Sequence, residues 1–146
     1  MEYELPFFER NKMDKLNQAR EFFKMDLFAT KLTGAKIDSV EENFCQCSME
    51  ITPDHKNAVG QVMGGAIFTL ADFAFAVAAN FDKQFPTVTL TSNVSFLSTV
   101  KGSTLIARAQ LIKDGKRNCF YLVEVKDDLD KLIATVNISG AKIIKQ

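Results

Sequence analysis

One acidic residue, Asp72, lies inside the most apolar stretch of the chain, which runs from Gly64 to Ala79. An ionised carboxylate is costly in such surroundings unless it is paired or hydrogen-bonded, and no lysine or arginine occurs between Lys56 and Lys83. Apolar walls also raise the pKa of a carboxyl group, which suits it to general-base chemistry near neutral pH. Asp72 is therefore a candidate for proton transfer. The plain alternative is a hydrated carboxylate on a solvent-facing stripe.

Two glycines, Gly64 and Gly65, begin the same stretch. The first backbone N–H groups of a helix have no partner within it, and the helix dipole adds positive potential there. Because glycine has no side chain, a ligand can approach this backbone closely. Such a helix start can stabilise the oxyanion that develops during acyl transfer, although paired glycines also serve close packing.

The spacing of these two features points to a second subunit. Asp72 follows Gly64 by eight residues, which is roughly 12 Å along a helix axis. One chain is therefore not expected to bring both groups to one reacting carbonyl, whereas two antiparallel helices around a two-fold axis can. Small and polar residues form a stripe that suits such an approach: Gly65, Thr69, Asp72 and Ala76. The spacing predicts a homodimer on which the chemistry depends.

The segment from Asn57 to Ala76 reads NAVGQVMGGAIFTLADFAFA. It resembles the signature of the hotdog-fold acyl-CoA thioesterases, in the PaaI-like branch of phenylacetate-degradation type, which runs Asn, Gly, His-Gly-Gly and then Leu-Ala-Asp. The resemblance extends from about Lys24 to Ile143. It implies hydrolysis of a small or aromatic acyl-CoA to the free acid and CoA. Neither a metal nor an organic cofactor is implied, because CoA is the carrier of the substrate.

The same resemblance implies catalytic roles for four residues. Asp72 matches the carboxylate that acts as general base on water or as nucleophile. Asn57 matches the residue that places the water or the thioester, and Gly64 the residue whose N–H polarises the thioester carbonyl. Thr89 falls where some relatives carry a serine or threonine that assists the water.

Four further residues are expected to contact the substrate. Lys116 and Arg117 lie in a predicted hairpin turn, where relatives contact the CoA phosphates; a solvated turn is the alternative. Gly65 continues the helix start. Met63 stands where the family has histidine, and a methionine side chain cannot hydrogen-bond strongly. Thioester placement and turnover rate therefore depend on this position, whereas the backbone N–H of Gly64 survives the change.

The chain has one histidine and three cysteines. His55 lies in the loop before the helix, so its position in the sequence does not replace the missing histidine, although a movement of the loop could bring it to the site. An odd cysteine count predicts free thiols at Cys45, Cys47 and Cys119. A zinc site is not expected, because the Cys45-x-Cys47 spacing is too short.

Periodicity predicts the elements that must position these residues. Apolar residues three or four apart predict a helix over 11–28, the apolar stretch predicts a central helix over 64–81, and 52–62 reads as a loop. Alternation and β-branched composition predict strands over 35–41, 44–51, 87–97, 103–113, 118–126 and 132–144. This order predicts an α+β fold. The resemblance makes it a hotdog fold, an antiparallel sheet wrapped around a long central helix with an N-terminal helix.

Composition sets the wider limits. With 146 residues, 47% of them hydrophobic and 25% charged, we expect a single globular domain over 1–146. Eighteen basic and 18 acidic residues leave no global field for nucleic acid or an anionic membrane. The chain start lacks a secretory signal pattern and no stretch is long enough to span a bilayer, so we expect a cytoplasmic protein. Relatives favour a homotetramer, a dimer of dimers.

Two other functions fit the same residues. A non-catalytic protein that binds acyl-CoA or an acyl carrier has the same fold, and Met63 is its best support. A structural protein in which a buried Asp72 specifies the dimer is the second.

Overall fold

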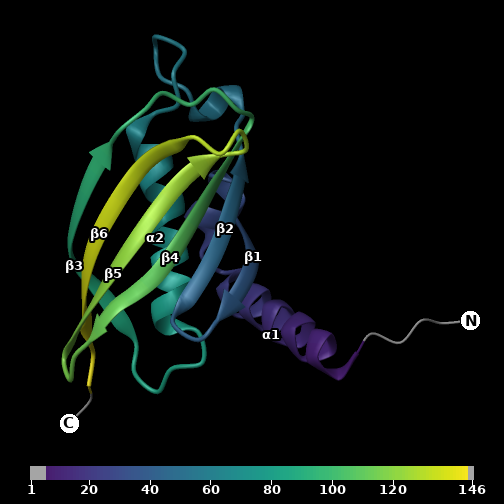
Figure 1. Ribbon diagram of the computed structural model, residues 1–146, viewed down its shortest axis with the longest axis vertical. Helices are drawn as coiled ribbons and strands as arrows, with labels where there is room; N and C mark the ends of the chain where they lie inside the picture. The colour runs from purple at the N-terminus through teal and green to yellow at the C-terminus, as the bar shows by residue number, and fades with distance from the viewer. Residues whose placement is uncertain (1–5, 145–146) are drawn as a thin grey trace, which may run out of the picture.

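A six-stranded antiparallel sheet curves around one long helix in the computed structural model, which describes residues 6–144 (Figure 1). The strands follow the order β1-β2-β4-β5-β6-β3 in the sheet. Their bounds are β1 (Lys36–Glu41), β2 (Phe44–Glu50), β3 (Thr87–Phe96), β4 (Thr104–Asp114), β5 (Asn118–Asp127) and β6 (Leu132–Lys142). The predicted α+β class, and the sheet wrapped around a central helix, are confirmed.

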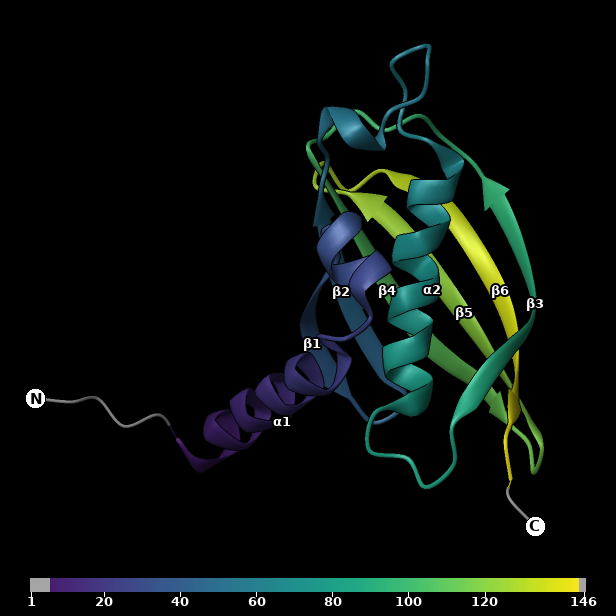
Figure 2. The ribbon, with the colours of Figure 1, turned by 180° about the vertical axis from the view of Figure 1, so that it is seen from behind.

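The central helix, α2 (Gly64–Asn80), fills the concave side of the sheet. Its inward residues Leu70, Ala74 and Val77 are fully buried. They meet the inward face of the strands, where side chains alternate with period two as the sequence predicted; Cys45, Cys47, Met49, Leu105, Ala107 and Val123 are buried there. The opposite side of α2 is not covered by the sheet, as Figure 2 shows.

The end of α2 fixes the start of β3. Asn80, the last residue of the helix, donates from Nδ2 to the carbonyl oxygen of Thr87 at 3.2 Å and accepts the Thr87 N–H on Oδ1 at 2.7 Å. These two bonds set β3 alongside the uncovered side of α2. Because β3 is an edge strand, it exposes much of its length, including the apolar Val88 and Leu90.

The N-terminal helix differs from the expectation. Instead of one helix over 11–28, α1 spans Phe7–Phe23 and a separate π-helical turn, η1, spans Phe28–Leu32. Pro6 directly precedes α1, and its carbonyl oxygen accepts the Arg10 N–H at 3.0 Å. After Phe23, which is buried, the chain turns so that residues 26–29 lie against α2. The C-terminal part of α1 contacts β1 through the Arg20 Nε–H, which donates to the carbonyl oxygen of Ile37 at 2.9 Å, whereas its N-terminal part extends away from the sheet (Figures 1 and 2).

A buried carboxylate ties two loops together at one end of the sheet. Asp127 is 1% exposed and accepts four backbone N–H groups at 3.0–3.1 Å; the donors are Lys101, Gly102, Leu129 and Lys131. Burial opposes the ionised form, but these four bonds outweigh it and hold the pKa of Asp127 below its ordinary value. The stability it contributes is therefore present above the ordinary aspartate pKa and is lost as the pH falls through the lowered one.

We expect Asp127→Asn to lower the free energy of unfolding by about 2–4 kcal/mol, because the new NH₂ group faces backbone donors instead of accepting from them. The matched control is Asp130→Asn in the same turn. Asp130 is exposed and its positive φ of 62° is one that asparagine tolerates, so a change within about 0.5 kcal/mol is expected. Urea unfolding followed by circular dichroism measures both. Equal effects of the two substitutions would contradict the anchoring role.

None of the helices in residues 6–144 combines the length and apolar character needed to cross a bilayer.

Candidate active site

Asp72 lies in the middle of α2, where its side chain is half-buried. The hydroxyl of Thr89, on β3, donates a hydrogen bond to Oδ1 of Asp72 at 3.4 Å. The pairing of β3 with β6 shifts register between Thr89 and Thr91, and such bulges redirect neighbouring side chains. Asp72 on α2 and Thr89 on β3, which are far apart in the sequence, are thus neighbours in the folded chain.

The surroundings of Asp72 oppose its ionisation and raise its pKa. Burial is the main cause that raises the pKa of Asp72, and the negative charge of Asp26 raises it further. The hydrogen bond from Thr89 acts in the other direction, because it stabilises the carboxylate. The net direction is upward, as expected for a carboxyl among apolar side chains. A group of this kind can hold and release a proton nearer to neutral pH than an exposed aspartate.

A cavity of about 350 Å³ opens beside Asp72. Volumes of this order are sufficient for a small organic ligand. Its walls come from α2 and from the segment that joins α1 to η1: Asp26, Leu27, Phe28, Ala29, Phe68, Thr69, Asp72, Phe73 and Ala76. Three members of the predicted stripe, Thr69, Asp72 and Ala76, therefore line it.

The segment from Asp26 to Ala29 is what the sequence reading missed at this site. The apolar spacing continued in a helical pattern through Phe28, so these residues were expected inside a helix. The break after Phe23 brings them to the cavity instead. No local sequence signal, such as a glycine or a proline between residues 20 and 30, marks the break.

The start of α2 carries the predicted backbone donors. Met63 is the N-cap in an extended conformation, and Gly64 and Gly65 are the first two helical residues. The N–H of Met63 donates to the carbonyl oxygen of His55 at 2.8 Å, while its side chain is 57% exposed. Gly64 lies about two helical turns from Asp72 and does not line the Asp72 cavity. Within one chain the two groups therefore remain apart, as their spacing predicted.

Asn57 is exposed in the loop before α2. Its Oδ1 accepts the backbone N–H of Val59 at 3.2 Å and of Gln61 at 3.1 Å. Gly60, with a φ of 79°, completes the same turn by donating its N–H to the Asn57 carbonyl oxygen at 2.9 Å. The side-chain oxygen of Asn57 thus shapes the loop that leads to the helix start. In this chain it does not line the cavity beside Asp72.

His55 is buried and has a structural task. Its Nδ1 accepts the N–H of Thr52 at 2.9 Å, so Nε2 carries the proton and donates to the carbonyl oxygen of Thr33 at 2.7 Å. These bonds hold the ring between the loop and the end of η1, and it does not line the Asp72 cavity. His55 therefore does not take the place of the histidine that Met63 replaces.

Lys116 and Arg117 are exposed in the turn between β4 and β5. The N–H of Gly115 donates to the carbonyl oxygen of Asn118 at 2.8 Å and closes the predicted hairpin. This turn lies at the end of the sheet near the C-terminal end of α2, away from the start of that helix (Figure 1). Any contact of these residues with a ligand at a helix start requires the helix start of another subunit.

The three cysteines are buried, free thiols, as predicted. Sγ of Cys45 and Sγ of Cys47 lie 3.5 Å apart in β2. Residues 6–144 hold no group of three or more potential metal-ligating side chains.

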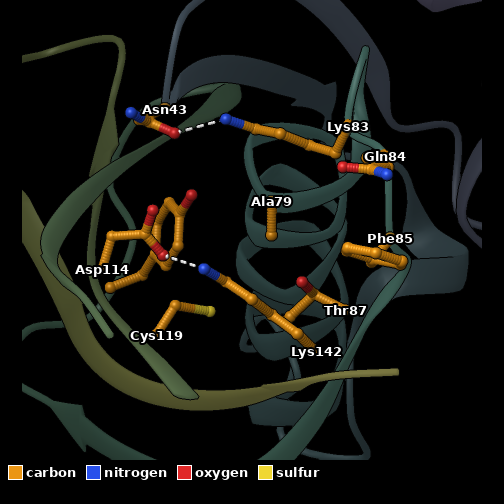
Figure 3. A pocket seen from close by; sticks show the side chains of 10 residues that line it. Asn43, Ala79, Lys83, Gln84, Phe85, Thr87, Asp114, Cys119 and Lys142 are labelled. Atoms are coloured by element: carbon orange, nitrogen blue, oxygen red, sulfur yellow. Dashed lines mark hydrogen bonds and ion pairs between the residues drawn. The ribbon is translucent and has the colours of Figure 1, made fainter. Parts of the chain in front are cut away.

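A second cavity, of about 190 Å³, lies at the C-terminal end of α2 (Figure 3). Its two ammonium groups are already partnered, Lys83 with Oδ1 of Asn43 at 2.6 Å and Lys142 with Asp114 at 2.6 Å. The Tyr121 hydroxyl donates to the carbonyl oxygen of Ala78 at 3.4 Å. Because its two ammonium groups and its tyrosine hydroxyl are already partnered, this cavity is a weaker candidate than the one beside Asp72.

Comparison with known proteins gives concordant results. The model of the thioesterase superfamily matches residues 59–134. The acyl-coenzyme A thioesterase PaaI of Escherichia coli is 33% identical over 105 residues, which cover 71% of this chain and 74% of the relative. Human acyl-coenzyme A thioesterase 13 is 31% identical over 91 residues, 60% of this chain and 65% of the relative. The solved structure of E. coli PaaI, from the phenylacetic acid degradation operon, superposes with a TM-score of 0.82 at 28% identity, covering 91% of this chain and 96% of that one.

Proposed function

Because the chain belongs to the thioesterase superfamily and has the hotdog fold of its PaaI-like members, we propose that it hydrolyses an acyl-CoA thioester to the free acid and CoA. The observation that carries this proposal is Asp72, a carboxyl of raised pKa, held by Thr89 at the wall of a 350 Å³ cavity. Water activated by a base, or attack by the carboxylate itself, is the chemistry that thioester hydrolysis needs.

Asp72 begins the reaction in either mechanism. As a base, the carboxylate takes a proton from water while the water oxygen bonds to the thioester carbonyl carbon. As a nucleophile, it bonds to that carbon itself and forms an anhydride that water then cleaves. In both mechanisms the C–S bond breaks and the CoA thiolate leaves. The Thr89 hydroxyl orients the carboxylate through its hydrogen bond to Oδ1.

The oxyanion is stabilised across a two-fold axis. Gly64 and Asp72 of one chain are separated by about two turns of α2, so the N–H that meets the carbonyl oxygen comes from Gly64 of the partner subunit. Two features support a homodimer that covers this side. Thr69, Asp72 and Ala76 of the small and polar stripe are only partly buried and line the cavity, and the edge strand β3 exposes Val88 and Leu90. Exposed apolar side chains on an unpaired strand edge are typical of interfaces.

The remaining predicted contacts follow from this pairing. In an antiparallel pair of helices, the C-terminal end of one α2 lies beside the start of the other. Lys116 and Arg117 of one subunit therefore approach the CoA bound at the helix start of its partner, where their charge suits the phosphates. The acyl group enters the cavity beside Asp72, where Phe28, Phe68 and Phe73 suit a small aliphatic or an aromatic acyl group. Met63 and Gly65 border the thioester.

A panel of short-chain and aromatic acyl-CoAs tests the proposal, with the released thiol detected by a thiol reagent. Turnover of at least one thioester above the enzyme-free rate is expected. The alternative, a non-catalytic acyl-CoA binder, is favoured by Met63 at the position of the family histidine. It predicts thermal stabilisation by CoA or an acyl-CoA without thiol release. Neither turnover nor stabilisation with any CoA compound would contradict both.

Thr89→Val is expected to lower kcat by about tenfold at pH 7. It removes the hydrogen bond that lowers the pKa of Asp72, so that pKa rises further and the acid limb of the pH–rate profile moves to higher pH. Thr89→Ser keeps the hydroxyl and should behave like the parent. Thr91→Val, on the same exposed strand, is the matched control. An acid limb that stays in place in Thr89→Val would show that this hydroxyl does not act on Asp72.

A further inference from the structure

Two carboxylates, Asp26 and Asp72, line one cavity. Apart from Thr69, the other residues of its wall are apolar. Among residues 6–144, no lysine, arginine or histidine lines it. Two acidic groups without a cation give the cavity a negative local charge. This charge repels an anionic ligand and has little effect on a neutral one.

The backbone holds Asp26 in this place. Its N–H donates to the carbonyl oxygen of Phe23 at 3.0 Å, and its own carbonyl oxygen accepts both the N–H of Thr30 at 2.9 Å and the Thr30 hydroxyl at 2.8 Å. The turn between α1 and η1 is therefore tied at both ends. These bonds use only backbone atoms of Asp26, and Asp26 is an exposed residue of the cavity wall.

Neighbouring cations do not neutralise this carboxylate within the described residues 6–144. Lys24, on the same turn, is paired with Glu21, and Lys31, on η1, is not part of the cavity wall. The charge of Asp26 is felt at Asp72, whose pKa it raises after the larger effect of burial. The two carboxyl groups therefore interact, and an anionic group in the cavity that both residues line is repelled by both.

Resting on the function proposed above, we propose that Asp26 is a specificity-determining residue, which makes this cavity accept neutral acyl groups and reject acyl groups that end in a carboxylate. A terminal carboxylate entering the cavity loses hydration and finds no cationic partner among the described residues of its wall. It also meets the like charges of Asp26 and Asp72. A terminal methyl or an aryl ring of similar size meets only the apolar wall.

Hexanoyl-CoA and adipyl-CoA form a matched pair for the test, because they differ in a terminal methyl group against a terminal carboxylate. We expect the parent protein to hydrolyse adipyl-CoA with a kcat/KM at least about tenfold lower. Asp26→Asn should narrow this ratio by about threefold or more, chiefly by improving adipyl-CoA turnover. Asp14→Asn removes the same charge from the exposed face of α1 and should leave the ratio unchanged.

Ionic strength gives a second readout that needs no substitution. Raising the salt from about 20 mM to about 500 mM shortens the reach of the two carboxylates, so the hexanoyl-to-adipyl ratio of the parent should fall, whereas rejection by shape alone would not respond. Equal kcat/KM values for the two thioesters would overturn this inference and leave the proposed function standing. A large ratio unaffected by both salt and Asp26→Asn would also overturn it. Failure to hydrolyse either thioester, or any other acyl-CoA, would overturn the proposed function and this inference with it.

Discussion

Asp72→Asn is expected to lower kcat for acyl-CoA hydrolysis by about 10³-fold, the scale on which a positioned base or nucleophile contributes. Asparagine has nearly the same shape and keeps an oxygen that accepts the Thr89 hydrogen bond, but it can neither take a proton from water nor attack the thioester. KM should change little, because the cavity wall is preserved. Steady-state thiol release at saturating substrate gives both parameters.

The same substitution should not weaken the fold. The pKa of Asp72 is raised in the folded state, chiefly by burial, so the ionised form costs the native state free energy at every pH above the ordinary aspartate pKa. That cost is complete above the raised pKa, declines as the pH falls from there towards the ordinary aspartate pKa, and is absent below it. Asp72→Asn removes it, so its Tm at pH 7 should equal or exceed that of the parent. Asp14→Asn serves as the control of equal charge change. Parental kcat in folded Asp72→Asn would contradict the assignment of this residue.

Gly64→Pro is expected to lower kcat by about 10²- to 10³-fold, because proline removes the backbone N–H that stabilises the oxyanion. Proline suits the first position of a helix, and the extended Met63 before it, with a ψ of 136°, is compatible with a following proline. The matched control is Gly64→Ala, which keeps the N–H. Both substitutions place a Cβ 2.9 Å from Cζ of Phe96, at the flexible end of that side chain. The difference between the two variants therefore isolates the loss of the donor.

Mixed subunits test where that donor acts. If Gly64 serves Asp72 of the partner subunit, a heterodimer of Gly64→Pro and Asp72→Asn chains holds one intact site and one doubly altered site. A fully exchanged equimolar mixture should then recover about one quarter of the parental activity, since half of the dimers are mixed and each has one working site. Two tagged chains purified together allow the heterodimer to be assayed alone. No recovery in the heterodimer would place both groups in the same subunit.

The pattern of side chains predicted the strands and the central helix well. Strand boundaries differ from the expected ones by at most two residues, and α2 begins at Gly64 as expected and ends at Asn80. Alternating burial on β2 and β4 is a local property, readable because successive strand residues point to opposite faces. The dense apolar run of α2 likewise predicts a helix that is buried on most sides.

The end of α1 was predicted wrongly because it is not a local property. The helical spacing of apolar residues continues past Phe23, and residues with high helix propensity, such as Lys24 and Met25, come next in the sequence. The chain turns there because packing against α2 favours residues 26–29 on the cavity wall, with the Thr30 and Thr33 hydroxyls bonding to the carbonyl oxygens of Asp26 and Phe28. Tertiary contacts commonly override propensity at helix ends.

The amino-acid sequence alone determined the fold class, the acidic residue in the apolar helix and the paired glycines at its start, since each depends on residue type and spacing along one element. Only the tertiary structure decided which residues surround Asp72. The two hydrogen bonds between Asn80 and Thr87, together with the register shift of β3, bring Thr89 close to Asp72. The turn after α1 places Asp26 on the wall of the same cavity. These neighbours lie 17 and 46 positions away in the chain, where no periodicity connects them. Their approach depends on how separate elements pack, which is a property of the folded chain as a whole.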